Sequence, residues 1–228
     1  MVMVHDKCEF KHGLFVSSNG MSGGLALMWK KDMKVEVQTF SPTHIDALVD
    51  GGTEYGWWRV TGFYGNPEMA KRPEAWAKLK QLSTTSTLPW IVIGNFNEII
   101  GMSEGGSARP RQQMSNFVNT INYYGLRDTG FVGPKYTWWY VRRDGEQIWE
   151  QLDRALATTE WLTLFPEAKL HHLTSSVSNH SPLLLKLFQK RRRRPKKLFC
   201  FESMWIKDPR CEEVVVEAWN DGLADRTV

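Results

Sequence analysis

Four groups of polar residues in this sequence could together carry out chemistry on a bound substrate. They are Tyr64 with Asn66, Asn95 with Asn97, Asn179 with His180, and Leu152-Asp153-Arg154. The first three groups stand at the ends of apolar, strand-like segments, and the fourth stands at a predicted helix entrance. Sites on sheet scaffolds are usually built where strands end. The spacing and order of the groups therefore favour a shared site.

Each group taken alone also has a structural explanation, which stays open. Asn66 precedes Pro67, which is typical of a turn. Asp153 could serve only as the cap of the helix that is predicted to follow it. Asn95 and Asn97 could form local hydrogen bonds within a loop. The argument for a site rests on the joint occurrence of the groups.

Apolar runs and turn residues predict the elements that would position these groups. The expected strands are 24–29, 34–40, 45–49, 57–63, 90–93, 136–141, 147–149, 168–173 and 183–188. The expected helices are 73–82, 111–124 and 152–164. An Asp144-Gly145 turn predicts that 136–141 and 147–149 form a hairpin. Interleaved strands and helices indicate an α/β or α+β class with an antiparallel contribution.

Length, charge and cysteine content indicate the number of domains, the possible partners and the cellular compartment. A chain of 228 residues favours one principal domain. Its net charge of +4 comes from the run Lys190 to Lys197, without which the chain is mildly acidic. That run reads equally well as a solvated linker and as a nuclear-localisation or nucleic-acid-contacting patch. Three cysteines without zinc or disulfide spacing favour a reducing, intracellular compartment. Neither a membrane span nor an obligate protein partner is indicated.

The order of the motifs resembles that of the endonuclease/exonuclease/phosphatase superfamily. The matching segments are Val60-Thr61-Gly62-Phe63-Tyr64-Gly65, Gly94-Asn95-Phe96-Asn97, Leu152-Asp153-Arg154 and Ser178-Asn179-His180-Ser181-Pro182-Leu183. More closely, the chain is similar to the apurinic-type endonuclease domain of plant non-LTR (LINE-type) retrotransposons. Segments that carry this closer resemblance are 22–29, 136–154 and 199–219.

The resemblance implies a four-layer α/β sandwich of two packed mixed sheets flanked by helices. It also implies hydrolysis of a DNA phosphodiester by water activated with Mg²⁺ or Mn²⁺. On this basis residues 1–188 form the endonuclease-like domain, 189–197 a basic linker, and 198–228 a short helical tail. The tail resembles the segment that precedes a reverse transcriptase, and 212–219 is its most regular helical stretch.

Residue roles follow from the resemblance, position by position. The implied catalytic residues are His180, Asp153, Asn97, Tyr64 and Asn66. Asn95 and Asn179 occupy positions where the family has Asp, one a candidate base and the other a metal ligand. The predicted nucleic-acid contacts are Arg109, Arg111, Lys135, Trp138, Arg142 and Arg143. For the hairpin arginines, a role as plain solvated turn residues is about as well supported.

Two departures from the family pattern lower the expected activity. An amide is a poor ligand for a hard cation and cannot accept a proton from water, so Asn95 and Asn179 weaken both metal binding and hydrolysis. The family's opening Asn-bearing strand and its Glu-ending strand are also not found. We therefore expect a truncated, marginally stable fold with little or no activity. Alternatives are a nucleic-acid-binding module without chemistry and, more distantly, a phosphatase acting on inositol phosphates or sphingolipids.

Overall fold

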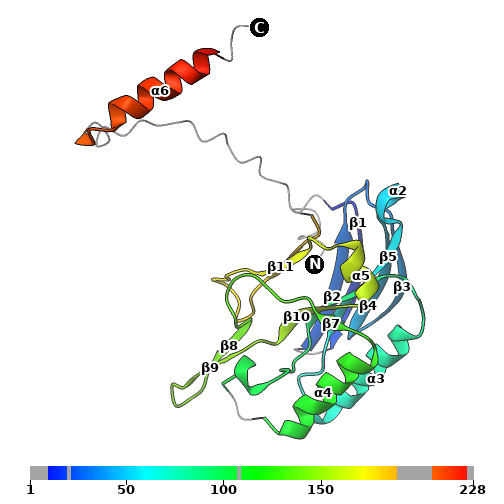
Figure 1. Cartoon of the computed structure of the whole chain (residues 1–228). Coiled ribbons are helices and arrows are strands. Elements are labelled where there is room, and N and C mark those ends of the chain that lie inside the picture. The colour runs from blue at the N-terminus through cyan, green and yellow to red at the C-terminus, as the bar shows by residue number, and fades with distance from the viewer. Residues whose placement is uncertain (1–9, 20–21, 107–108, 189–206, 225–228) are drawn as a thin grey trace. The chain divides into compact units, whose positions relative to one another are not determined.

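The computed structural model describes residues 10–19, 22–106, 109–188 and 207–224. The chain divides into two compact units, residues 1–189 and 190–228. The described part of the second unit contains the helix α6 (Cys211–Ala224), within the predicted tail (Figure 1). The predicted basic linker, and with it the nuclear-localisation run, lies outside the described residues. Among the described helices, none has both the length and the apolar character needed to cross a bilayer.

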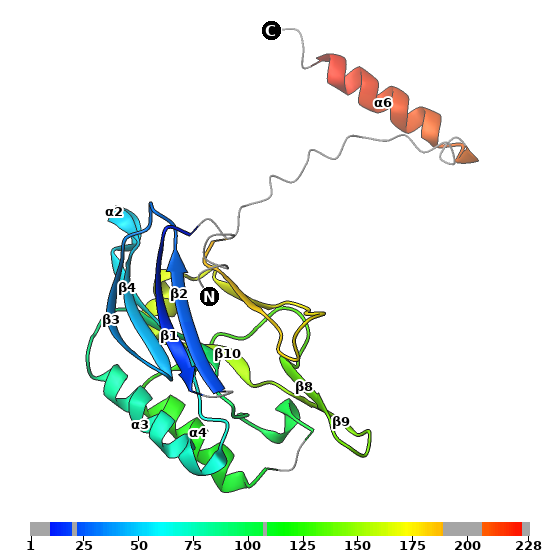
Figure 2. The same cartoon turned by 180° about the vertical axis from the view of Figure 1, so that it is seen from behind.

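A mixed six-stranded sheet forms the centre of the first unit (Figures 1 and 2). In spatial order its strands are β3 (Val35–Ser41), β4 (His44–Asp50), β5 (Trp57–Tyr64), β6 (Trp90–Asn95), β10 (Asp153–Ala157) and β7 (Arg127–Asp128). Strands β5 and β6 are parallel, and the other neighbouring pairs are antiparallel. A parallel pair needs a crossover connection, and the segment between β5 and β6 contains a helix that serves this purpose.

Two helices, α3 (Arg72–Ser83) and α4 (Arg111–Tyr123), cover one face of this sheet. On α3 the buried apolar residues recur at helical spacing, which gives the helix one core-facing stripe. The resulting core contains Phe63, Ala75, Trp76, Leu79, Leu82, Trp90, Val92, Phe96, Phe117, Ile121, Leu126 and Leu156. Trp76 stacks on Phe117 with ring centroids 4.6 Å apart, which joins the two helices.

The opposite face carries a helix and two separate two-stranded ribbons. These elements are α5 (Thr159–Leu164), β1 (His12–Asn19) paired with β2 (Ser22–Trp29), and β11 (Lys169–His172) paired with β12 (Leu183–Lys186). In the described ranges the two ribbons share no strand pair with each other. Val60 and Ile93, from the central strands β5 and β6, are only half-buried on this face. This layer thus covers the sheet less completely than the helices do.

The remaining elements connect these layers. They are α2 (Gly52–Tyr55), η1 (Met69–Lys71), η2 (Met102–Glu104), β8 (Trp138–Val141) and β9 (Gln147–Glu150). Strands β8 and β9 form the predicted hairpin, and Gly145 takes the positive φ of 89° that its turn requires. Strands β1 and β7 were not predicted, and β7 is too short to carry a pattern. Mixed strand pairing with flanking helices agrees with the predicted α/β class.

The prediction of one helix over 152–164 was wrong. Residues Asp153–Ala157 form strand β10, and the helix begins only at Thr159. Each residue of β10 is buried, so its side chains on both faces are covered. A strand buried on both faces loses its alternating pattern and cannot be told from a buried helix by periodicity. Asp153 is consequently no helix cap; Thr158 caps α5, its hydroxyl accepting from the Trp161 amide.

Glycine is required where β5 and β6 end. Gly94 has a φ of 147°, and a Cβ built there would lie 2.1 Å from the carbonyl oxygen of Phe63. The neighbouring Gly65 approaches Phe96 almost as closely, with a Cβ–oxygen distance of 2.2 Å. The two strands therefore meet too tightly for any side chain at these points. This explains the first residue of the Gly94-Asn95-Phe96-Asn97 motif.

We predict that Gly94→Ala destabilises the chain by roughly 3 kcal/mol, because the methyl group meets backbone that cannot move away. Gly101→Ala is the matched control, since a Cβ there has no neighbour within 4 Å and its φ of −160° is extended. It should change stability by less than about 1 kcal/mol. Urea unfolding measures both changes. Equal effects of the two substitutions would contradict the close approach of the two strands.

Candidate functional site

Three of the predicted site residues form a row across neighbouring strands. Tyr64 of β5 is in register with Asn95 of β6, and Asn95 is in register with Asp153 of β10. Residues directly opposite one another in a sheet point to the same face. The three side chains therefore lie side by side where β5 and β6 end and β10 begins, although the residues are far apart in sequence.

The loop after β6 is held by its own asparagines. The side-chain oxygen Oδ1 of Asn95 accepts a hydrogen bond from the backbone N–H of Asn97 at 2.8 Å. Asn97 has a φ of 53°, a left-handed conformation that asparagine tolerates better than most residues. Its Nδ2 donates to the carbonyl of Gly65 at 2.7 Å. The loop thus uses Oδ1 of Asn95 and Nδ2 of Asn97. The other amide atom of each side chain has no hydrogen-bond partner among the described residues.

His180 reaches the same row from another part of the chain. Its Nδ1 lies 2.9 Å from Oδ2 of Asp153, and the two side chains are 35% and 11% exposed. Because an ionised carboxylate only accepts hydrogen bonds, Nδ1 carries the proton and donates. Asp153 thereby orients the imidazole, and the second ring nitrogen, Nε2, is the one left for a substrate.

Thr137 is a positioning residue for both partners, and no role was predicted for it. Its side chain is 1% exposed, and Oγ1 accepts from the backbone N–H groups of Leu152 at 3.0 Å and Asp153 at 2.9 Å. Its carbonyl accepts from the N–H of Ser181 at 2.7 Å, beside His180. One residue thus fixes the start of β10 and the histidine loop. Its partners are distant in sequence, so no local pattern indicates this role.

Beneath the loop lies a buried network of ion pairs. Glu98 has no exposed surface and pairs with Arg72 at 2.7 Å and Arg109 at 3.1 Å. Arg109 also contacts Glu150 and donates to the carbonyl of Asn97 at 3.3 Å. Burial lowers the pKa of Arg72 from its usual value, and the adjacent Glu98 carboxylate opposes that shift. The network fixes the loop from below.

Arg109 was predicted to contact nucleic acid, and the structure places it in this network. Its side chain is 12% exposed and its guanidinium bonds to Glu98, Glu150 and the Asn97 carbonyl. Few of its donors remain for a phosphate. Its role as a nucleic-acid contact stays a prediction.

The other predicted nucleic-acid contacts lie nearer the surface. Arg111, Lys135, Arg142 and Arg143 are exposed. The half-buried Trp138 stacks on Tyr140 and lies 6.4 Å from the ring of His180, centroid to centroid. The hairpin therefore places an aromatic ring next to His180 and carries exposed arginines at its turn. Asn66, by contrast, forms a turn, its side chain accepting from the N–H of Glu68.

The site residues present do not fit a divalent cation. Of Tyr64, Asn95, Asn97, Asp153, Asn179 and His180, only Asp153 is a carboxylate, and one of its oxygens is bonded to His180. Mg²⁺ prefers oxygen ligands, above all carboxylates. No cluster of three or more His, Cys, Asp or Glu residues suited to a metal is found in the described ranges.

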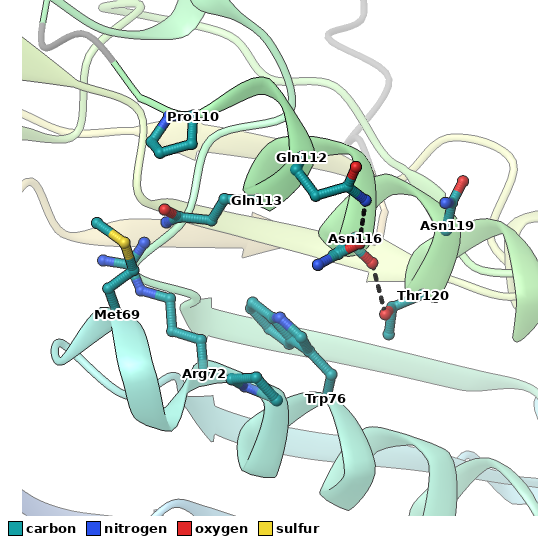
Figure 3. Close-up of a pocket in the computed structure, with 10 residues that line it drawn as sticks. Met69, Arg72, Trp76, Pro110, Gln112, Gln113, Asn116, Asn119 and Thr120 are labelled. Atoms are coloured by element: carbon teal, nitrogen blue, oxygen red, sulfur yellow. Dashed lines mark hydrogen bonds between the residues drawn. The ribbon is translucent and has the colours of Figure 1, made fainter.

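A separate pocket of about 530 Å³ lies between α3 and α4 (Figure 3). Its lining residues are Met69, Arg72, Pro73, Trp76, Pro110, Gln112, Gln113, Asn116, Asn119 and Thr120. The pocket includes no residue of the row. Arg72 and Gln113 nevertheless connect it to the site, because both bond to Glu98.

A family model described as "Endonuclease/Exonuclease/phosphatase family" matches residues 4–180, more than half of the chain. The chain belongs to this family. The superfamily predicted from the four motifs is therefore confirmed. No curated protein sequence matches the chain.

Solved structures support the same fold. The endonuclease domain of TRAS1, a telomere-specific non-LTR retrotransposon, has a TM-score of 0.59 at 14% identity, covering 79% of this chain and 81% of that one. A variant of the 3' phosphatase NExo from Neisseria, bound to product DNA hairpin, has 0.56 at 15%, covering 82% of each. An AP endonuclease from Archaeoglobus fulgidus has 0.55 at 15%, covering 79% and 80%. At these identities the likeness shows the fold alone, and it confirms the predicted fold class.

We predict that Thr137→Val destabilises the chain by about 2–4 kcal/mol, because two buried N–H groups lose their acceptor. Thr137→Ser, which keeps the hydroxyl, should recover most of this loss. Urea unfolding reports stability, and NMR of the His180 ring reports whether its contact with Asp153 persists. A stable Thr137→Val variant with an unchanged His180 signal would show that Thr137 positions neither residue.

Proposed function

We propose that this chain is a DNA-directed, endonuclease-like domain of non-LTR retrotransposon origin whose hydrolytic activity is impaired. The observation that carries the proposal is the His180–Asp153 contact of 2.9 Å. Asp153 is in register with Asn95, and Asn95 is in register with Tyr64, at the ends of neighbouring strands. A histidine oriented in this way can hydrogen-bond a phosphate and deliver a proton. These groups suit a phosphodiester as substrate or ligand.

Hydrolysis also needs a group that accepts the proton of the attacking water. Asn95 and Asn179 stand at the positions where the family motifs have carboxylates, and an amide has no useful basicity. General base catalysis is worth roughly 10²–10⁴-fold. Poor metal ligation would cost transition-state stabilisation in addition. Among the described residues, the site therefore has groups suited to hold a phosphate and amides at the two positions where the family motifs have carboxylates.

Three features support retrotransposon ancestry and DNA as the ligand. The motif order and the segments 136–154 and 199–219 resemble plant LINE-type elements. The TRAS1 endonuclease domain has a similar fold. An Asp→Asn variant of the Neisseria phosphatase is bound to product DNA, so a similar fold carrying this kind of change still holds DNA. The expected plant origin belongs to the same proposal.

The second candidate is a nucleic-acid-binding module without chemistry. The exposed cations of the β8–β9 hairpin favour it, together with aromatic rings such as Trp139 and Trp149, which are 40% and 43% exposed. Bases stack on exposed aromatic rings, and cations contact the phosphates. This candidate differs from the first only in having no residual cleavage. In the ranges that the structure describes, no comparable surface feature supports the phosphatase alternative.

We predict that the chain nicks abasic plasmid DNA at least about 10²-fold more slowly than the Archaeoglobus AP endonuclease under the same Mg²⁺ conditions, for want of a general base. Gel electrophoresis of nicked and supercoiled plasmid measures the rates. His180→Ala should remove any residual nicking by the chain itself, because the imidazole that faces the phosphate is lost. Robust Mg²⁺-dependent nicking that His180→Ala abolishes would refute the claim of impaired hydrolysis.

We predict that Arg142 and Arg143 of the hairpin bind DNA phosphates. Arg142→Gln/Arg143→Gln should reduce the slope of log K against log salt by roughly 0.9 for each duplex phosphate that is no longer neutralised. Lys30→Gln/Lys31→Gln removes equal charge from the exposed turn after β2 and is the matched control. Fluorescence anisotropy at several salt concentrations gives both slopes. Identical slopes for the two variants would show that the arginines are solvated turn residues only.

A further inference from the structure

The site residues include polar groups that no described residue of the protein uses. Oδ1 of Asn95 is committed to the Asn97 N–H, and its Nδ2 has no hydrogen-bond partner among the described residues. Nδ1 of His180 is committed to Asp153, so Nε2 is left over, and it donates a hydrogen bond when the imidazole carries its second proton. In the described part of the chain, the Tyr64 hydroxyl also has no hydrogen-bond partner. These are the kinds of groups that bind phosphate oxygens.

The Asn179 side chain completes this set. It is exposed, while its backbone carbonyl is held by the Trp139 N–H at 3.1 Å. Asn179 directly precedes His180, and this hydrogen bond fixes its backbone next to the histidine. An amide at this position supplies a donor that a carboxylate could not supply.

The local charge also suits an anion bound without a counter-ion. Asp153, the one carboxylate among the six site residues, is paired with His180. The network under the loop is balanced, since Arg72 and Arg109 face the two carboxylates of Glu98 and Glu150. Carboxylates at positions 95 and 179 would repel a phosphate unless a cation neutralised them. With asparagine at both positions, that repulsion is removed.

We propose that this site binds a phosphodiester group of DNA directly, through Asn95, Asn179, His180 and Tyr64, without a divalent metal ion. The proposal rests on the proposed function, because it takes DNA as the ligand. It goes beyond that function by stating that amide, imidazole and hydroxyl groups alone hydrogen-bond the phosphate oxygens.

The experiment measures binding of a short fluorescein-labelled DNA duplex by anisotropy, in EDTA and in Mg²⁺ at matched ionic strength. The unmodified chain should bind equally well in both buffers. Asn95→Asp/Asn179→Asp should bind about tenfold more weakly in EDTA, because two carboxylates then face the phosphate. Mg²⁺ should reverse part of that loss. Thermal melting checks that the variant is folded, and the Asn97 N–H can still donate to an aspartate at position 95.

Asn119→Asp/Asn122→Asp is the matched control, since it adds the same charge at exposed positions on α4. It should lose less than about twofold in either buffer. Binding by the unmodified chain that disappears in EDTA would overturn the metal-free site while leaving DNA as the ligand. Equal weakening by the two double variants would overturn the role of Asn95 and Asn179. Absence of DNA binding in every buffer would instead refute the proposed function, and this inference with it.

Discussion

Burial of the Glu98 carboxylate is the constraint on which the arrangement around the site depends. An unpaired charge with no exposed surface would cost several kcal/mol, so cations must converge on it from other elements. Arg72 comes from α3, and Arg109 comes from the loop before α4. Arg109 also forms an ion pair with Glu150, the last residue of the hairpin strand β9. Because Glu98 follows Asn97 directly, pairing this single charge ties together the motif loop, the helical layer and the hairpin.

Local patterns predicted what is encoded locally. The buried strand at 90–93, the Asp-Gly hairpin and the two helices that cover the sheet were all predicted from short windows of sequence. The order of the motifs predicted that Tyr64, Asn95 and Asp153 belong to one site, and the strand register places them next to one another. What was missed depends on distant partners: β10, whose burial on both faces hides its alternation, and the roles of Thr137 and Glu98.

Shape and charge are separable at this site. The Asn97 N–H needs an oxygen from residue 95, and an amide supplies that oxygen as well as a carboxylate would. The loop therefore keeps its conformation when the charge is absent. His180 keeps its orientation because its partner Asp153 is held by Thr137, independently of the asparagines. An amide in place of a carboxylate at position 95 therefore leaves the hydrogen bonds that hold the loop in place.

Strand β2 has a consequence for how the chain behaves among other chains. In the described ranges it forms a strand pair with β1 alone, so its other edge presents backbone donors and acceptors outside any ladder. Natural sheets protect such edges with charged residues, above all lysine. The segment Ser22–Trp29 contains no Lys, Arg, Asp or Glu. Among the described residues, this edge therefore carries none of the charged side chains that oppose strand addition.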